Sequence, residues 1–127
     1  MPQANKDQAA EHPIVIEANR GRVRVFFQGR VVADTTRALS LMETTLPKVL
    51  YIPREDADMS LLERTTHKSH CPFKGDAAYY SIRAGDKEAR NAVWSYEQPY
   101  PGVAQIKGHL AFYPDRVDRI EEVPAGR

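Results

Sequence analysis

Short apolar runs alternate with turn residues along most of the chain. In RVRVFFQGRVVAD, residues 22–34, apolar side chains recur at every second position from Val23 to Phe27 and are followed by a Gln-Gly pair. A period of two predicts a strand with one buried face, and a two-residue break before the next apolar run predicts a tight hairpin. We therefore expect strands at 22–27 and 30–34.

Similar segments follow downstream and indicate a chain of many short strands. KVLYIP predicts a strand that Pro53 ends, because proline has no N–H to donate to a ladder. AAYYSIR and NAVWSYE alternate on either side of an Ala-Gly-Asp turn and predict a second hairpin. VAQIKGHLAFY predicts a long strand with a β-bulge at Gly108, and VDRIEE predicts the last strand. The expected strands are at 49–52, 77–83, 91–97, 104–113 and 117–122.

Two segments between these strands are less regular. TTRALSLMETTLP, residues 35–47, fits either a short helix or an irregular strand. REDADMSLLERT, residues 54–65, begins with acidic residues and continues with apolar ones, which is the order typical of a short helix. Long helices do not alternate with the strands, so a parallel α/β sheet is disfavoured. The predicted fold class is mainly β, a small antiparallel sandwich or partly closed barrel with one short helix.

The length of 127 residues fits one domain, which we expect at residues 14–127. Residues 1–13 are polar and lack the apolar stretch of a signal peptide, so we expect a flexible leader there. No stretch approaches the roughly 18 apolar residues of a membrane span, and no membrane partner is expected. The single cysteine excludes an internal disulfide and fits a reducing cytoplasm.

The charge pattern argues against a nucleic-acid partner. The chain carries 18 basic and 17 acidic residues, a formal net charge of +1, and the two signs are interspersed. Nucleic-acid backbones attract proteins through basic patches or runs, and the sequence shows none. A net charge this close to zero gives little repulsion between copies, and several short strands leave edges to cover. We therefore expect a homodimer.

The segment THKSHCPFKGDAAYY, residues 66–80, concentrates the reactive side chains of the chain. As a nucleophile, Cys71 needs to form a thiolate. The neighbouring Lys74, His67 and His70 are candidate sources of positive charge or of a base. Cysteine is also among the most buried residue types, which would make Cys71 a small apolar side chain at a structural corner. A reactive thiol and a structural role both stay open.

A metal site is not predicted from this segment. His67, His70 and Cys71 are suitable ligands, and His109 could complete a tetrahedral set. Structural zinc sites usually show two pairs of Cys or His residues, whereas this chain has one cluster. We therefore interpret His67 and His70 as exposed loop residues.

The Lys74-Gly75 pair allows another interpretation. A lysine ammonium beside backbone N–H groups can hold a carboxylate or phosphate, and glycine permits the positive φ of such an anion nest. A solvated lysine at a turn would give the same sequence. Arg54 is a second cation at the end of a predicted strand, and Glu43 lies between apolar stretches, from which it could pair with Arg54.

Together, these charges and the aromatic residues near them predict a small-molecule pocket. Such pockets are concave and mostly apolar, with a few charged groups. Large aromatic side chains on an inner strand face also build sandwich cores, so a core role for Tyr80 and Trp94 is the alternative. The candidate ligand-binding residues are Glu43, Tyr51, Arg54, Lys74, Gly75, Tyr80, Trp94 and Tyr96, and Cys71 is the candidate catalytic residue.

Four segments carry a family resemblance: YIPREDADMSLLERTTHKSHCPFKG, AAYYSI, AVWSYEQPYP and IKGHLAFYPDRV. They resemble the DUF427 family of small, mostly bacterial domains of unknown function, also labelled nucleotidyltransferase family 9, from about Arg22 to Glu121. The family run T-x-C-P-x-K-G is matched by Thr66 or Ser69 and then by residues 71–75, and its W-S-Y-E and G-x-x-A-F-Y segments are present. The resemblance implies a compact, mainly β domain.

The resemblance leaves the function open. The sequence contains neither a G-S…D-x-D arrangement nor a Gly-rich P-loop, which phosphoryl transfer would ordinarily use to hold Mg²⁺ and phosphates. We expect a small-molecule binding domain, with an anionic metabolite as one candidate ligand. The alternatives are a non-catalytic interaction or scaffold module and a thiol-dependent enzyme that uses Cys71. The sequence does not identify a cofactor.

Overall fold

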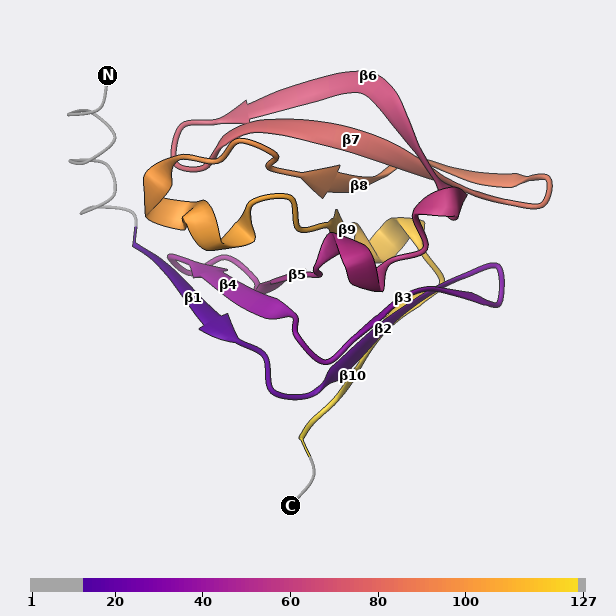
Figure 1. Cartoon of the computed structure of the whole chain (residues 1–127), viewed down its shortest axis with the longest axis horizontal. Helices are drawn as coiled ribbons and strands as arrows, with labels where there is room; N and C mark the ends of the chain where they lie inside the picture. Colours follow the sequence, from indigo (N-terminus) through magenta and orange to yellow (C-terminus); the bar gives the residue numbers. More distant parts are fainter. Residues whose placement is uncertain (1–12, 126–127) are drawn as a thin grey trace.

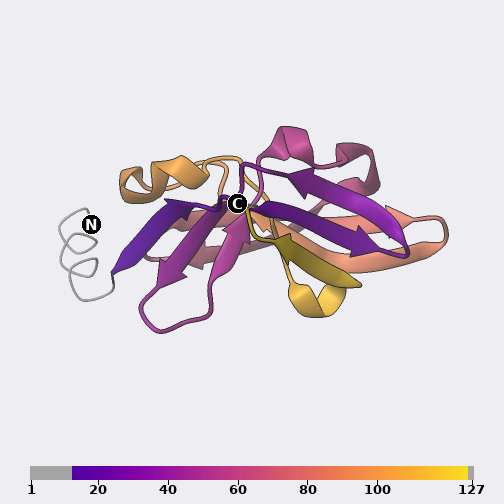
Figure 2. The ribbon, with the colours of Figure 1, turned by 90° about the horizontal axis from the view of Figure 1, so that it is seen from below.

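The computed structural model describes residues 13–125, which fold into a β-sandwich. A four-stranded sheet forms one layer, and two three-stranded sheets lie side by side in the other (Figure 1, Figure 2). Strands make up 57% of the structure and helical segments 13%. The mainly β prediction is therefore confirmed in its sandwich form, and the described strands do not close a barrel. The predicted leader, apart from Pro13, lies outside the described residues.

Neighbouring strands are antiparallel in all three sheets, and the helical segments are short 3₁₀ turns. The strands are β1 (Ile14–Ala18), β2 (Arg22–Phe27), β3 (Arg30–Thr35), β4 (Leu39–Glu43), β5 (Val49–Tyr51), β6 (Leu62–Cys71), β7 (Gly75–Ala84), β8 (Lys87–Ser95), β9 (Ala111–Phe112) and β10 (Arg119–Val123). The 3₁₀ segments are η1 (Arg54–Asp56), η2 (Met59–Leu61), η3 (Pro101–Ile106) and η4 (Pro114–Arg116). The sheet orders are β6-β7-β8-β9, β1-β4-β5 and β10-β2-β3. No helical segment in residues 13–125 is long and apolar enough to cross a membrane.

The predicted first hairpin forms β2 and β3. The two valines of β2 are fully buried, and Phe27 is 6% exposed. Gln28 and Gly29 both have positive φ, 52° and 73°, which is the backbone of a type I′ turn. The second predicted hairpin forms β7 and β8. Both hairpins are therefore confirmed. β2 is the central strand of its three-stranded sheet, and β7 and β8 are the two central strands of the four-stranded sheet.

Strand β6 does not appear among the predictions, although it is ten residues long. It pairs only with β7, and most of its side chains are exposed. An edge strand with little buried surface needs no apolar alternation, so LERTTHKSHC has the composition of a loop. His67 and His70 thus lie on a strand, and both are exposed as expected. The short strand β1 was also not predicted, and β4 shows that the ambiguous segment at 35–47 contains a strand.

The long strand predicted at 104–113 is wrong. The segment forms part of η3 and the two-residue β9. Val103 and Ile106 are buried, and a spacing of three residues is that of a 3₁₀ turn rather than a strand. Gly108 has a φ of 72° and turns the chain towards β9 instead of forming a bulge. The helix expected within 54–65 is likewise divided into two 3₁₀ turns, η1 and η2.

Two clusters of buried side chains fill the space between the layers. The first joins the β2–β3 hairpin to β7 and β8, and the second joins β4 and β5 to β7 and η3. Backbone contact also links the layers, because Ile52 and Leu110 exchange two N–H···O bonds of 2.8 Å. The second cluster surrounds the candidate functional site.

Candidate ligand site in an aromatic cavity

A cavity of about 230 Å³ lies beside the second core cluster. Its walls are mostly aromatic and include one acidic and one basic side chain. The lining residues are Leu41, Glu43, Val49, Tyr51, Lys74, Tyr79, Trp94, Tyr96 and Tyr113. They come from β4, β5, β7 and β8 and from the turns that follow β6, β8 and β9. Both layers of the sandwich therefore contribute to the cavity.

Lys74 reaches this cavity from the tight turn between β6 and β7. Its N–H donates to the Cys71 carbonyl at 3.2 Å, and its own carbonyl accepts from the Tyr100 N–H at 3.0 Å. Gly75 follows with a φ of 112°, a conformation that glycine adopts far more readily than other residues. The turn is thus fixed on both sides of Lys74, which is only 7% exposed.

Glu43, at the end of β4, pairs with the buried ammonium of Lys74. Lys74 Nζ lies 2.6 Å from Glu43 Oε1, and the two side chains are 9% and 14% exposed. Lysine is rarely buried without a partner, because removing a charge from water is costly. Apolar replacements of a buried ion pair often leave a protein as stable or more so, which makes such a pair weak evidence for a role in stability. Both members of the pair line the wall of the cavity.

The aromatic walls orient one another. The Trp94 ring is tilted against Tyr113 with centroids 4.5 Å apart, and it meets Tyr51 edge-on at 6.4 Å. Trp94 Nε1 also donates to the Tyr51 hydroxyl at 3.3 Å. Lys74 Nζ lies 5.9 Å from the centre of the Tyr96 ring, within the range of a cation–π contact. The cavity therefore presents aromatic surface next to an ammonium group.

Burial raises the pKa of three of the phenols that line the cavity. It raises the pKa of Tyr51 and of Tyr96 far above the ordinary value of tyrosine. Burial, together with a hydrogen bond to Tyr79, raises the pKa of Tyr113 to about 12. At neutral pH these phenols are uncharged hydrogen-bonding groups, and the formal charges of the lining are those of the ion pair.

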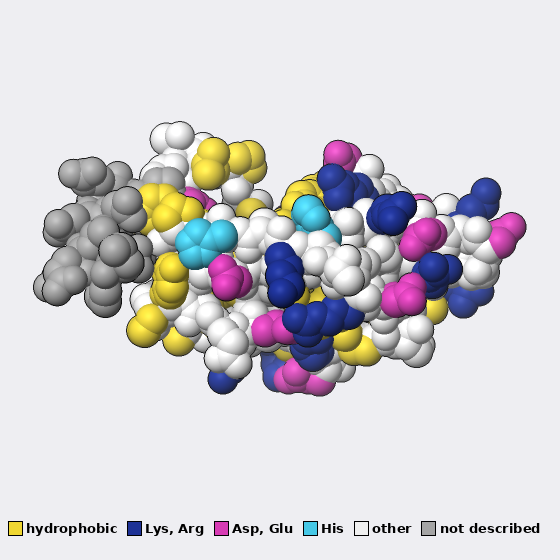
Figure 3. Space-filling model, turned by 90° about the horizontal axis from the view of Figure 1, so that it is seen from above, with side chains coloured by type: hydrophobic (Ala, Val, Ile, Leu, Met, Phe, Trp, Pro, Cys, Tyr) yellow, Lys and Arg dark blue, Asp and Glu magenta, His cyan; other side chains and the backbone are white. Residues whose placement is uncertain are grey.

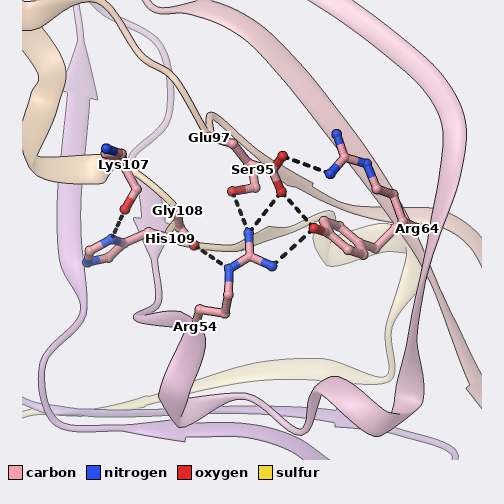
Figure 4. A network of polar contacts seen from close by, with 8 residues as sticks. Arg54, Arg64, Ser95, Glu97, Lys107, Gly108 and His109 are labelled. Atoms are coloured by element: carbon pink, nitrogen blue, oxygen red, sulfur yellow. Dashed lines mark hydrogen bonds and ion pairs between the residues drawn. The ribbon is translucent and has the colours of Figure 1, made fainter.

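Arg54 belongs to a second polar cluster, shown in Figure 4. Its guanidinium donates to the Gly108 carbonyl at 3.1 Å, to the Tyr80 hydroxyl at 3.0 Å and to Glu97 Oε2 at 3.2 Å. Tyr80 donates to the same Glu97 oxygen at 2.7 Å, and Arg64 lies 2.9 Å from the other carboxylate oxygen. The network joins η1 to β6, to β7 and to the segment after β8.

The network keeps Glu97 ionised. Burial alone would raise the pKa of this carboxyl, but the Tyr80 hydrogen bond and the charges of Arg64 and Arg54 lower it below the ordinary value. A general base at neutral pH needs a pKa nearer 7, so Glu97 is suited to anchoring the network rather than to proton transfer.

Strand alternation separates this network from the cavity. Trp94 and Tyr96 line the cavity, whereas Ser95 and Glu97 accept hydrogen bonds from Arg54. Successive residues of an extended chain point to opposite sides. Residues 94–97 therefore contribute to two different sites. The residues that the sequence predicted to form a single pocket are divided between the cavity and the network.

The predicted ligand-binding residues other than Gly75 are divided between two sites. Those that line the aromatic cavity are Glu43, Tyr51, Lys74, Trp94 and Tyr96. Arg54 and Tyr80 belong to the network, and Gly75 shapes the turn that carries Lys74. The expected pairing of Glu43 with Arg54 is wrong, because Glu43 pairs with Lys74 and Arg54 pairs with Glu97. The ligand-binding role of the first group stays a prediction.

Cys71 is not among the residues that line the cavity. Its free thiol is half-buried and packs against the second core cluster. The adjacent His70 points to Asp76, with Nδ1 and Oδ1 2.7 Å apart on the exposed surface, and His67 packs on the Tyr79 ring at 4.4 Å. Within the described residues, no three His, Cys, Asp or Glu side chains gather as a metal-binding group.

Tyr79 and Tyr113 in the cavity, and Arg64 and Glu97 in the network, are absent from the predicted site. Period-two alternation places Tyr80 inward and Tyr79 outward, but β7 is covered on both faces and both tyrosines are buried. Tyr113 is the last residue of the segment wrongly expected to be one long strand. The W-S-Y-E and A-F-Y segments of the family resemblance contain Glu97 and Tyr113, and this was the available signal for both.

Charges of both signs are mixed on the face of the molecule that carries β6 (Figure 3). Exposed ion pairs contribute to this mixing, including Arg83 with Glu63 at 2.6 Å. No broad basic area is visible on the described part of this face. The exclusion of nucleic acid as a partner stays a prediction.

The family model described as a domain of unknown function (DUF427) matches residues 15–123. The chain therefore belongs to the DUF427 family, as the motif at residues 71–75 and the W-S-Y-E segment indicate. No curated protein matches the sequence at a significant level. Membership in this family assigns no activity, so a function has to be argued from the geometry of the site.

Proposed function

We propose that the protein binds a small planar molecule in the aromatic cavity, through contacts with the rings and a hydrogen bond from Lys74. The observation that carries this proposal is the Glu43–Lys74 pair, whose charged atoms lie 2.6 Å apart in a wall that is otherwise mainly aromatic. Apolar walls with a few convergent polar groups are the usual composition of a ligand pocket.

The size of the cavity suits a group of one or two rings. The volume is about 230 Å³, whereas pockets for drug-sized molecules begin near about 300 Å³. An apolar cavity of about 150 Å³ is large enough for benzene. A flat ring suits the walls formed by Trp94 and Tyr113, because aromatic rings attract one another in offset and tilted arrangements.

The ion pair favours a neutral hydrogen-bond acceptor on the ligand. A lysine ammonium has three N–H donors, and one of them is directed at Glu43 Oε1. A ligand carbonyl or ring nitrogen can accept from another of these donors while the ion pair stays intact. An anionic metabolite, the candidate suggested by the sequence, would instead compete with Glu43 for the ammonium. We therefore place neutral heterocycles ahead of anions.

A thermal-shift screen of pyrimidines, purines and nicotinamide-like amides tests this proposal. A ligand that binds only the folded state raises the melting temperature. We expect stabilising compounds for the native protein and a loss of their effect in the double variant Glu43→Gln/Lys74→Met, which removes both charges at similar volume. The exposed Lys68→Met variant is the matched control and keeps the response. Absence of any stabilising compound would favour the scaffold alternative.

Two broader proposals rest on the sequence and the strand edges. The single cysteine fits a reducing cytoplasm. The exposed edge of β6 and the small net charge favour a homodimer, since closed symmetric pairing is the commonest way to cover such edges. Light scattering that gives a monomer mass at micromolar concentration would contradict the dimer.

A further inference from the structure

The aromatic cavity contains a phenol whose hydroxyl has no hydrogen-bond partner within residues 13–125. This phenol is Tyr96, which lines the cavity and is only 6% exposed. Every fully buried side-chain nitrogen or oxygen of the described residues has a hydrogen-bond partner. The Tyr96 hydroxyl is therefore not enclosed in the core, and it faces the open space of the cavity that the residue lines.

The other phenols of the lining differ from Tyr96 in this respect. The Tyr51 hydroxyl accepts an indole N–H at 3.3 Å, and the Tyr79 hydroxyl lies 2.8 Å from Ser69 Oγ. Tyr113 is in turn hydrogen-bonded to Tyr79. A buried polar group without a partner is costly, and donors without an acceptor are rarer in proteins than oxygens with spare lone pairs. A hydroxyl that faces a cavity without a partner therefore points to a ligand that accepts its proton in a hydrogen bond.

The Tyr96 ring is held in place next to the ion pair of the cavity. Its backbone carbonyl accepts the Gly108 N–H at 3.0 Å, and the Lys74 ammonium lies 5.9 Å from the centre of its ring. Burial, together with nearby groups that include the Glu43 carboxylate, raises the pKa of the Tyr96 phenol. The hydroxyl therefore keeps its proton at neutral pH and can donate it. An ammonium and a phenol, two different donors, line the same cavity.

We infer that Tyr96 determines which ring compounds the cavity accepts, and that the ligand is a ring with two acceptor groups, such as a pyrimidinedione. Lys74 donates to one acceptor and Tyr96 to the other. This inference rests on the proposed function and narrows its ligand class. A ring with a single acceptor, held by Lys74, would displace water from the Tyr96 hydroxyl and leave that donor unpaired. Sites built to hydrogen-bond a polar group reject analogues that lack it, because the site's own polar group is then left without a partner.

Uracil and 2-pyridone are the test pair, because these planar rings differ by one carbonyl group and one ring N–H. Their dissociation constants are measured on the full chain by NMR titration, followed at the indole N–H of Trp94, which lines the cavity. We expect uracil to bind at least about tenfold more tightly than 2-pyridone. In Tyr96→Phe, which keeps the ring and removes the hydroxyl, the ratio should fall below about threefold. Tyr100→Phe removes a phenol hydroxyl outside the cavity lining and is the matched control, which should keep the tenfold ratio.

The outcomes separate this inference from the proposed function. Equal affinities of the native protein for the two rings, or an unchanged ratio in a folded Tyr96→Phe variant, would overturn the role of Tyr96 and leave the ring-binding cavity in place. Failure of uracil to bind at millimolar concentration would also overturn the inference, and the screen of ring compounds then shows whether the proposed function fails with it. The comparison of the two rings on the native protein needs no variant, so it decides the question even if Tyr96→Phe fails to fold.

Discussion

Lys74 Nζ lies 2.6 Å from Glu43 Oε1, although the two residues belong to different layers of the sandwich. Glu43 ends β4 in one layer, and Lys74 lies in the turn between β6 and β7 in the other. Both side chains are largely buried, and both line the aromatic cavity. The pair therefore connects the two sheets at the place where we propose that a ligand binds.

Removing one member of this pair should destabilise the protein strongly. Lys74→Met removes the ammonium that pairs with the Glu43 carboxylate, and breaking a buried ion pair by removing one partner costs about 3–5 kcal/mol. The double variant Glu43→Gln/Lys74→Met should lose much less than the sum of the two single variants, because it leaves no uncompensated charge. Urea unfolding of all four proteins measures this coupling. Additive losses would show that the two side chains do not act as a pair.

The buried tyrosines should make the protein sensitive to alkali. The pKa of Tyr113 is raised to about 12 in the folded state, against about 10 in an unfolded chain. The raised pKa contributes stability that is complete below about pH 10 and is lost as the pH rises towards 12. Unfolding free energies should therefore fall over this window, and Tyr113→Phe should reduce the slope. An unchanged slope in this variant would contradict the raised pKa.

Glu97 should make the opposite contribution in acid. Its pKa is lowered in the folded state, so the stability it supplies is present above about pH 4.3, the ordinary value of glutamate, and is lost as the pH falls through the lowered pKa. Tyr80→Phe removes the hydrogen bond to the carboxylate and should raise the pKa of Glu97 in an NMR titration. Glu63→Gln, in an exposed ion pair, is the control and should change stability by less than about 1 kcal/mol.

Gly75 should resist substitution because of its backbone conformation. Its φ of 112° is strained for any residue with a Cβ atom, and such strain costs about 1–3 kcal/mol. Gly75→Ala should therefore lower the free energy of unfolding by this amount and disturb the turn that carries Lys74. Gly102→Ala is the matched control, because no φ restriction applies there and an added Cβ meets nothing within 4 Å. Equal effects of the two substitutions would contradict this account.

The hairpins could be predicted because local alternation and turn chemistry agree with the tertiary structure. The Gln28-Gly29 turn has the positive φ values that its residues permit, and the side chains before it are buried on one face. Strand β6 could not be predicted in this way, because an edge strand buries few side chains. The prediction of a strand around Val103 and Ile106 was wrong for a different reason. Apolar residues three positions apart are compatible with a 3₁₀ turn and with an irregular strand, so the pattern alone does not distinguish the two.

The cavity could be predicted in part. Lys74 was a candidate because a lysine beside a glycine can form an anion nest, and Glu43 because it lies between apolar stretches from which it could pair with Arg54. The aromatic residues were candidates because ligand pockets are rich in them. The pairing of each cation with its carboxylate depends on how distant strands pack. It also depends on the alternation of side chains from Trp94 to Glu97, which places Glu97 on the side away from the cavity and next to Arg54. Arg54 was therefore expected in the cavity and lies in the Glu97 network instead.

The most direct test of the central claim is NMR mapping of a stabilising ring compound on the full chain. We predict that the largest chemical-shift changes occur at the Trp94 indole N–H and at Lys74 and Tyr96, with NOEs between the ligand ring and Trp94 or Tyr113. The double variant Glu43→Gln/Lys74→Met should show neither. Shift changes that lie outside the cavity, or that persist in the double variant, would contradict the claim that the aromatic cavity is the binding site.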